Sequence, residues 1–290
     1  MKDYIIRGID EKETIRFFVA STTNLVEKAR KIHNTSPTAT AALGRVLTAA
    51  AMIGITLKNE KDTLTIRIQG DGPIGNIVCV ANSKGEVKGY ADYPQADVPS
   101  RADGKLDVGR LVGKNGHIVV IRDLGLKEPF AGYSNLVTGE IAEDLVNYFY
   151  HSEQQPSAIS LGVLVDRDIS VRAAGGFMIQ LLPGVSEEDI EKIEGILKNI
   201  KPMSTLIDEG LTPEEILKEI FGEFKVKLLS KIPVEYKCNC SVEKIESALI
   251  SLGNEELKNI IEEDGKAEVV CHFCNTKYRF SKDALVQLLK

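Results

Sequence analysis

Four cysteines near the C-terminal end are the residues whose type and spacing point most directly to chemistry. They form two close pairs, Cys238-Asn-Cys240 and Cys271-His-Phe-Cys274, with thirty residues between the pairs. In a chain without a secretion signal, two such pairs are typical of a tetrahedral site in which four thiolates hold one zinc ion. A Cys-x-Cys pair is rarer and more constrained than Cys-x-x-Cys, which makes the combination specific. We therefore predict one zinc ion bound by Cys238, Cys240, Cys271 and Cys274.

Two other candidates for chemistry, His272 and Cys79, receive structural interpretations instead. His272 lies inside the second pair, but four cysteines already complete a tetrahedral zinc site, so we expect its imidazole to face solvent. Cys79 lies in an alternating run, residues 76–81, and is expected to be a buried strand residue rather than a redox centre.

The segment between the two pairs must bring them together. Ser241 can cap a helix that ends at Gly253, and a second helix begins at Asn254 or soon after and ends at Gly265. Residues 267–270 alternate like a short strand that leads into the second pair. A module this small buries little apolar surface, so we expect its fold to depend on the metal.

The middle of the chain is acidic and carries two amphipathic patterns. Residues 183–230 contain 6 basic and 11 acidic side chains, whereas residues 1–182 are neutral overall. Ser186 precedes one predicted helix, and Thr212-Pro-Glu-Glu215 is a capping box that begins another. Helices of about three turns are marginal alone in water, so each must dock its apolar stripe on a neighbour. Two interpretations stay open: a permanently packed linker, or a metastable linker that unfolds when its neighbour does.

The first 182 residues alternate between strand and helix patterns. Ser36 and Pro37 begin a helix that extends to about Leu57, and its alanine-rich, almost uncharged sequence predicts burial on most sides. Other helices are expected at residues 25–32 and 139–150. Lys114-Asn-Gly116 is interpreted as a hairpin turn. Strands are expected at residues 4–9, 15–20, 63–69, 76–80, 86–90, 117–122, 158–166 and 177–182.

These patterns predict an α+β protein in three parts. Residues 1–182 form an N-terminal mixed α/β core domain, residues 183–230 an amphipathic helical linker, and residues 231–290 a small C-terminal zinc-binding domain. With 290 residues and 43% apolar side chains, the chain is long enough for such cores and is not disordered as a whole.

Several functions are disfavoured by what the sequence contains. Gly70-Asp-Gly72-Pro-Ile-Gly75 matches the dinucleotide-binding spacing, but Pro73 and the strand pattern that follows replace the helix that this motif requires. His33, His117 and His151 are isolated and are expected at the surface or in packing. No common hydrolase or nucleotide-phosphate motif accompanies them, so we expect no enzymatic activity.

Charge and hydropathy disfavour two classes of partner. The net charge is −6 and no segment is basic, which weighs against nucleic acid. No apolar run reaches the length of a membrane span, so no membrane partner is expected. Residues 1–13 mix acidic and basic side chains, unlike a secretory signal, and a cytoplasmic protein is the expectation.

The terminal module and the acidic segment together suggest a redox mechanism. Oxidation of the thiolates would destroy the metal ligands and unfold the module. The linker would then lose its support and expose apolar surface that can hold other unfolded proteins.

The chain resembles the family of 33-kilodalton redox-regulated heat-shock chaperones. The most specific match is the pair of cysteine motifs followed by Tyr278 and Phe280, and the resemblance covers essentially the whole chain. The other matching stretches are Ser36-Pro-Thr-Ala39, Leu43-Gly-Arg45, Gly70-Asp-Gly-Pro73, Ala173-Ala-Gly-Gly176 and Gln180-Leu-Leu-Pro-Gly184.

The resemblance implies an ATP-independent holdase that is largely inactive in its reduced, zinc-bound form. Oxidised, it would form the disulfides Cys238–Cys240 and Cys271–Cys274, release zinc, unfold its linker and assemble as a homodimer. It would then bind unfolded client proteins during oxidative or heat stress. The sequence alone leaves three disulfide pairings open, so the adjacent pairing rests on the resemblance.

Two alternatives from other functional classes remain at this stage. One is a constitutive zinc-ribbon adaptor that binds a fixed partner. The other is a thiol oxidoreductase that uses Cys271 and Cys274, which would require an accessible, low-pKa thiolate that is not bound to metal.

Overall fold

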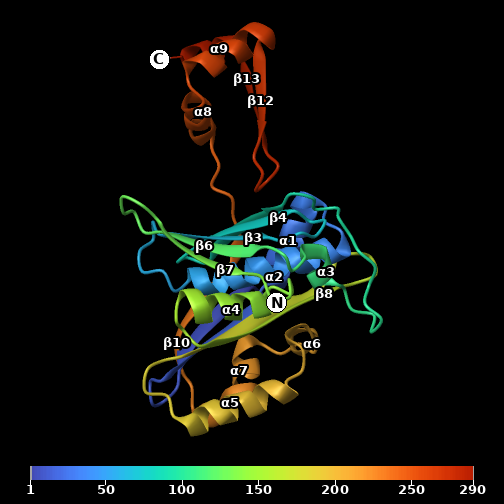
Figure 1. Ribbon diagram of the computed structural model, residues 1–290, viewed down its shortest axis with the longest axis vertical. Coiled ribbons are helices and arrows are strands. Elements are labelled where there is room, and N and C mark those ends of the chain that lie inside the picture. Colours follow the sequence, from blue (N-terminus) through green and yellow to red (C-terminus); the bar gives the residue numbers. More distant parts are fainter. Residues whose placement is uncertain (1, 290) are drawn as a thin grey trace. The chain divides into compact units, whose positions relative to one another are not determined.

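The computed structural model describes residues 2–289 and divides into two compact units, the first ending at Tyr236 and the second beginning at Lys237 (Figure 1). Strands of the described residues form a five-stranded and a six-stranded sheet in the first unit and a two-stranded sheet in the second. Helices accompany all three sheets. The expected α+β class is therefore confirmed.

The five-stranded sheet is antiparallel and has the order β10-β1-β2-β9-β8. Its strands are β1 (Tyr4–Ile9), β2 (Ile15–Ser21), β8 (Ser157–Val165), β9 (Val171–Leu181) and β10 (Lys227–Pro233). Because side chains alternate along a strand, each of these strands supplies residues to both faces. Ile5 and Phe18 thus belong to one core, and Ile6 and Phe17 to another.

The six-stranded sheet has the order β11-β5-β4-β3-β6-β7. Its strands are β3 (Thr63–Gln69), β4 (Asn76–Asn82), β5 (Glu86–Ala91), β6 (His117–Asp123), β7 (Phe130–Asn135) and β11 (Glu235–Tyr236). The short strand β11 pairs in parallel with β5, so the end of the first unit returns to this sheet.

Helix α2 (Pro37–Gly54) packs against strands of both large sheets. Ser36 caps it by accepting a hydrogen bond from the Ala39 backbone N–H, as its sequence predicts. Every residue of α2 except Pro37 and Arg45 is buried, which confirms the expectation drawn from its alanine-rich composition. The other helices of this core are α1 (Thr23–His33), α3 (Val108–Val112) and α4 (Ala142–Ser152).

The opposite face of the five-stranded sheet is covered by the acidic segment (Figure 1). Its elements are α5 (Glu187–Asn199), α6 (Met203–Asp208), α7 (Pro213–Phe221) and the 3₁₀ turn η1 (Gly222–Phe224). Ser186 caps α5, and Thr212 and Glu215 form the expected capping box of α7. The apolar stripes of these helices bury Ile193, Ile216 and Phe221 against the sheet.

The second unit is small and mixed. It contains α8 (Val242–Ser251), α9 (Asn254–Glu263), β12 (Lys266–Val270), β13 (Lys277–Ser281) and α10 (Lys282–Gln287). The two strands pair as an antiparallel hairpin. Ser241 caps α8, and Gly253 separates α8 from α9, in agreement with the sequence prediction. The buried core of the described terminal residues consists of Leu249, Leu257, Ile261, Phe280 and Leu285.

The structure corrects the hairpin interpretation of residues 114–116. These residues connect α3 to β6, and the neighbours of β6 in the sheet are β3 and β7. The Asn115 side-chain amide instead donates a hydrogen bond of 2.6 Å to the Asp71 carboxylate. Asn-Gly therefore shapes a helix-to-strand connection here.

Strand β9 begins six residues before the predicted strand 177–182. The unexpected part contains Gly175 and Gly176, whose composition disfavours strand structure in isolation. A Cβ atom on Gly176 would lie 2.5 Å from the Ser160 carbonyl oxygen of β8. Close backbone packing inside the sheet thus selects glycine in this strand. Other elements absent from the prediction are α3, β7, α6, β10, β11, β13 and α10.

The compact units do not coincide with the three predicted parts. Residues 183–230 lie within the first unit, and the predicted boundary at 230/231 falls inside β10. That strand pairs with β1, for example Ile6 with Lys231. The linker and the terminal domain beginning at residue 231 therefore remain predictions about functional segments.

Candidate metal centre

The first cysteine pair lies directly before α8, and the second lies in the turn between β12 and β13. The turn is held by backbone hydrogen bonds from Cys271 N–H to the Thr276 carbonyl, 2.9 Å, and from Asn275 N–H to the Cys271 carbonyl, 2.8 Å. Asn275 has a positive φ of 56°, which asparagine tolerates better than most residues. The hairpin register therefore fixes Cys271 and Cys274 on one tight turn.

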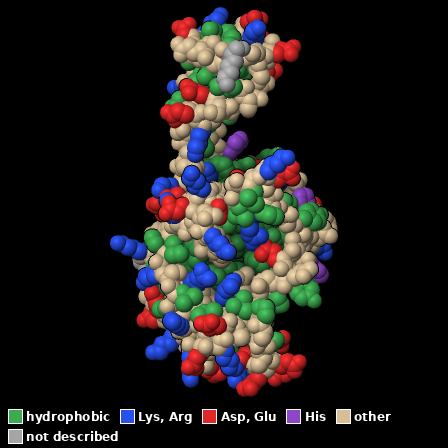
Figure 2. Space-filling view, turned by 90° about the vertical axis from the view of Figure 1, so that its left-hand side faces the viewer, with side chains coloured by type: hydrophobic (Ala, Val, Ile, Leu, Met, Phe, Trp, Pro, Cys, Tyr) green, Lys and Arg blue, Asp and Glu red, His purple; other side chains and the backbone are tan. Residues whose placement is uncertain are grey.

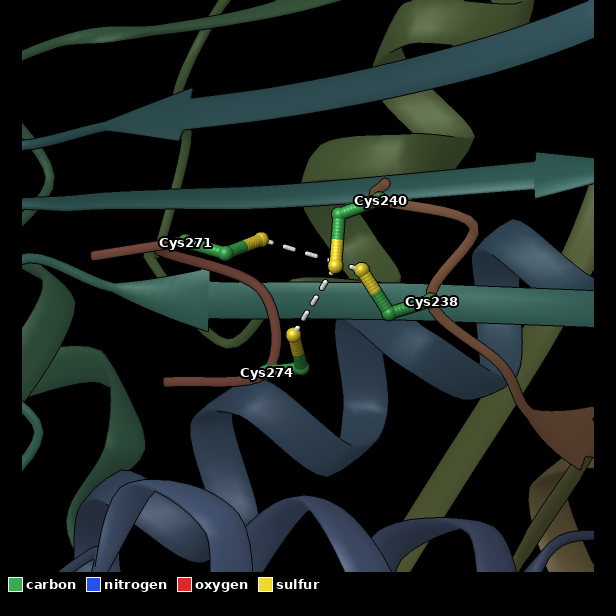
Figure 3. A group of neighbouring side chains, drawn as sticks. All are labelled: Cys238, Cys240, Cys271 and Cys274. Atoms are coloured by element: carbon green, nitrogen blue, oxygen red, sulfur yellow. Dashed lines mark hydrogen bonds between the residues drawn. The ribbon is translucent and has the colours of Figure 1, made fainter. Parts of the chain in front are cut away.

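The four sulfur atoms converge (Figure 3). All four Sγ atoms lie within 4.8 Å of one another. Cys238 Sγ is 3.7 Å from Cys271 Sγ, and Cys240 Sγ is 3.3 Å from Cys274 Sγ. A metal bound to four thiolates at about 2.3 Å in a tetrahedron sets neighbouring sulfurs about 3.8 Å apart. The observed spacing fits one such ion, and all five cysteines of the chain are unbridged in this structure.

The surroundings of the sulfurs affect their protonation in different ways. Burial raises the pKa of Cys238 to about 12 and also raises the pKa of Cys271. At Cys274, burial acts in the same direction, but hydrogen bonds with the Thr276 side chain and backbone, together with those to Cys240 and Cys271, outweigh it and lower the pKa to about 7. Because like charges so close oppose each other's ionisation, a bound cation is needed to hold all four sulfurs as thiolates.

Tyr278 is the polar side chain that the sequence prediction did not place at this site. Its hydroxyl donates a hydrogen bond of 3.0 Å to Cys240 Sγ. This contact raises the pKa of Tyr278 to about 12, so the phenol keeps its proton near neutral pH. The sequence feature that could have placed Tyr278 at this site is its position in a strand directly after the second cysteine pair. Alternation along that strand puts Tyr278 and Phe280 on one face.

The other sequence expectations for single residues are confirmed. His272 is exposed, and Cys79 in β4 is completely buried, with its pKa raised by that burial. His33 is buried and its Nε2 lies 3.1 Å from the Tyr236 hydroxyl. His117 stacks on Tyr133 in the six-stranded sheet, 5.4 Å between ring centroids.

The glycine-rich stretch of residues 70–75 serves a turn, as expected. The Gly72 backbone N–H donates to the Val112 carbonyl at 2.9 Å, and strand β4 follows the stretch directly. No helix begins there whose amides could receive a pyrophosphate. Within residues 2–289, moreover, none of the helices combines the length and the apolar character needed to cross a membrane.

Comparison with known proteins gives a consistent result. The family model described as Hsp33 protein matches residues 3–281. A 33 kDa chaperonin of Thermoanaerobacter sp. (strain X514) is 50% identical over 290 residues, which cover 100% of this chain and 99% of that protein. A 33 kDa chaperonin of Staphylococcus aureus (strain JH9) is 48% identical over 288 residues, covering 99% and 98%.

A solved structure agrees with these relatives. The crystal structure of the 33 kDa chaperonin (heat shock protein 33 homolog) from Thermotoga maritima superposes with a TM-score of 0.90 at 41% identity. The match covers 99% of this chain and 98% of that one. On the extent of these matches, the chain belongs to the Hsp33 protein family.

Proposed function

We propose that this protein is a redox-regulated, ATP-independent chaperone that holds unfolding proteins and prevents their aggregation. The observation that carries the proposal is the convergence of four thiols within 4.8 Å in a unit with a small apolar core. The relatives named 33 kDa chaperonin support the chaperone activity. The chemistry of the four sulfurs supports the redox control.

In the reduced state, Cys238, Cys240, Cys271 and Cys274 hold one zinc ion. Four soft sulfur ligands in a tetrahedron suit zinc better than magnesium or calcium, which prefer oxygen. When bound, zinc cross-links the two cysteine pairs and compensates the charge of four thiolates. The terminal unit then gains the stability that its few buried side chains do not provide, and the chaperone is inactive.

Oxidation removes the ligands in two balanced reactions. In each one, two thiolates lose two electrons to one hydrogen peroxide, which takes up two protons from the solvent and becomes two water molecules, and an S–S bond forms. We assign the disulfides as Cys238–Cys240 and Cys271–Cys274, by analogy with the family that the sequence resembles. A disulfide sulfur is a poor metal ligand, so the terminal unit loses its cross-link and unfolds.

The second step is undocking of the linker, residues 183–230. Helix α5 is weakly held: all thirteen of its residues are described, and those buried are Asp189 and Ile193. A groove of about 530 Å³ lies between α5, α6 and α7 and is lined by Ile196, Ile200, Leu206 and Ile220 among others. Loose packing of this kind lowers the free energy of local unfolding.

Undocking would expose one face of the five-stranded sheet together with the apolar stripes of the helices. The sheet residues buried beneath the linker are Tyr4, Ile6, Ile15, Phe17, Val19, Phe177 and Ile179. A contiguous apolar surface of this composition binds unfolded polypeptides without sequence specificity. Client proteins and a second copy of the oxidised chain, forming a homodimer, are the partners that we propose.

Holding a client needs no bond-making step, so we infer no enzymatic role. On the face shown in Figure 2, lysine and arginine are interspersed with aspartate and glutamate, an arrangement that offers no support for binding nucleic acid. We propose that the protein acts in the cytoplasm, where reducing conditions keep the four cysteines reduced until oxidative stress, and that it protects clients during oxidative or heat stress.

The test is light scattering of a heat-unfolding client protein with the reduced and the peroxide-treated chain. We expect the oxidised form to suppress aggregation and the reduced form to do so weakly. Cys79→Ala is the matched control, because it removes the buried cysteine outside the cluster and should leave the response intact. Equal activity of both forms would contradict redox control of the chaperone. Inactivity of both forms would favour a structural zinc ribbon.

A further inference from the structure

The phenol of Tyr278 distinguishes one thiol of the cluster from the other three. Its hydroxyl donates a hydrogen bond of 3.0 Å to Cys240 Sγ. Cys238 and Cys271 interact with backbone N–H groups of the turns, those of Cys240, Phe273 and Cys274, whereas Cys274 interacts with both the backbone and the hydroxyl of Thr276. A hydrogen bond from a side chain can be removed by substitution without altering the backbone. The effect of the Tyr278 hydrogen bond can therefore be tested separately from the other contacts of the cluster.

The fold holds the tyrosine ring in place. Tyr278 lies in β13 opposite Val269 of β12, and its ring packs against the terminal core. Phe280, two residues further along the same strand, is 6% exposed and anchors that face. The hydroxyl is therefore directed at Cys240 by packing, and the hydrogen bond requires little ordering of a flexible side chain.

We propose that Tyr278 is a positioning residue that sets how fast Cys240 reacts with oxidants. This inference rests on the proposed function, because it concerns the regulation of the same thiolates. A thiolate attacks peroxide by forming an S–O bond while the O–O bond breaks, which yields a sulfenic acid and hydroxide. The sulfenic acid then condenses with a neighbouring thiol to form a disulfide and water.

A hydrogen bond to the sulfur slows the first of these steps. The donor stabilises the electron pair that must form the S–O bond, so the thiolate becomes a weaker nucleophile. The intrinsic reactivity of thiolates follows their basicity with a Brønsted coefficient of about 0.4–0.5. Removal of this one hydrogen bond should therefore accelerate the reaction by a small factor, on the order of threefold.

The experiment compares Tyr278→Phe with the unaltered full-length chain, each reduced and loaded with one zinc ion. The proteins are treated with hydrogen peroxide, or separately with iodoacetamide, and the modification of each cysteine is followed by mass spectrometry. We expect Cys240 to react about threefold faster in Tyr278→Phe and the other three cysteines to keep their rates. Phenylalanine retains the ring, so the terminal core stays filled.

Thr276→Val is the matched control. It removes a hydroxyl that lies 3.2 Å from Cys274 Sγ, so it deletes a side-chain hydrogen bond to a different sulfur of the cluster. This variant should leave the Cys240 rate unchanged. Chelator competition and thermal unfolding of the zinc-loaded variants establish that metal affinity and folding are retained.

Two results would overturn the inference. An unchanged Cys240 rate would mean that the hydrogen bond does not control reactivity. An equal increase in the modification rates of all four cysteines would mean that Tyr278 only supports the packing of the terminal unit. Both readouts are independent of chaperone activity, so a failure of the proposed function, seen in the aggregation assay, is distinguishable from a failure of this inference.

Discussion

The two compact units differ in what stabilises them. The first has two large sheets that enclose the buried helix α2, and its apolar core includes side chains from all of these elements. In the second, the buried apolar residues among those described are Leu249, Leu257, Ile261, Phe280 and Leu285. Small units with few buried side chains generally need a metal or disulfides to remain folded. Under the proposed function, an oxidant that attacks the four sulfurs therefore acts directly on the stability of the second unit.

A second comparison lies within the first unit, between the two faces of the five-stranded sheet. One face packs on α2, whose burial is nearly complete. The other face packs on α5, α6 and α7, of which α5 is mostly exposed. The same sheet thus has one face covered by a nearly fully buried helix and one face covered by helices of which α5 is mostly exposed. Because the helices on the second face are less buried than α2, selective unfolding of the linker is expected to cost less free energy than unfolding of α2.

The largest expected effect is on the terminal unit alone. Cys271→Ser replaces the most buried ligand of the proposed zinc site and should lower zinc affinity by more than about 100-fold. Amide hydrogen exchange should then show loss of protection in α8, α9 and β12, with α2 and the six-stranded sheet of the first unit still protected. Protection retained in all three elements after zinc removal would contradict the contrast between the units.

The next effect tests whether docking of the linker, residues 183–230, controls activity. Phe221 of α7 is fully buried, with ring centroids 5.3 Å from Phe17 and 5.6 Å from Phe177. Phe221→Ala should destabilise the docked linker by about 3–5 kcal/mol and give chaperone activity in the reduced, zinc-loaded protein. The aggregation assay measures this activity. Glu219→Ala, an exposed position on the same helix, should remain inactive when reduced; if both behave alike, linker docking does not control activity.

A third effect concerns the first unit and the dependence of its stability on pH. The hydrogen bond from Arg30, aided by the Val171 backbone N–H, holds the pKa of Glu27 at about 2, below its ordinary value of 4.5. The charged form is therefore favoured by folding, so the stabilisation is complete above pH 4.5 and is lost as pH falls towards 2. It amounts to at most about 3 kcal/mol.

Urea unfolding of the first unit between pH 5 and pH 2 measures this dependence. Glu27→Gln should be less stable at pH 5 and should lose less stability on acidification than the unaltered protein. Parallel curves for the two proteins would show that Glu27 does not contribute to the pH dependence.

The smallest effect is local to the linker. The Thr212 hydroxyl accepts a hydrogen bond from the Glu215 backbone N–H, and Glu215 binds back to the Thr212 backbone N–H. Thr212→Ala removes half of this capping box and should cost about 1 kcal/mol of helix stability. Hydrogen exchange in α7 should accelerate about fivefold, with exchange in α2 unchanged. Acceleration in both helices would mean that they unfold together.

The sequence by itself determined the features that depend on interactions between residues close together in the chain. Ser36-Pro37 begins α2 and Thr212-Pro213 begins α7, because a cap and a proline act within one helical turn. The spacing of the cysteines likewise indicated that four sulfurs converge, since each pair sits on its own turn. The rejection of a dinucleotide site at residues 70–75 followed from Pro73 and the strand pattern after it.

Tertiary structure alone decided the features that depend on partners distant in sequence. Strand β10 exists because β1, more than two hundred residues earlier, supplies its hydrogen-bonding edge, and its own sequence shows no strong pattern. The glycines of β9 lie in a strand because the neighbouring backbone leaves no room for a side chain. The contact of Tyr278 with Cys240 joins residues 38 positions apart through the packing of the terminal unit. Sequence patterns report each residue's local preference, whereas these contacts arise when packing brings separate segments together.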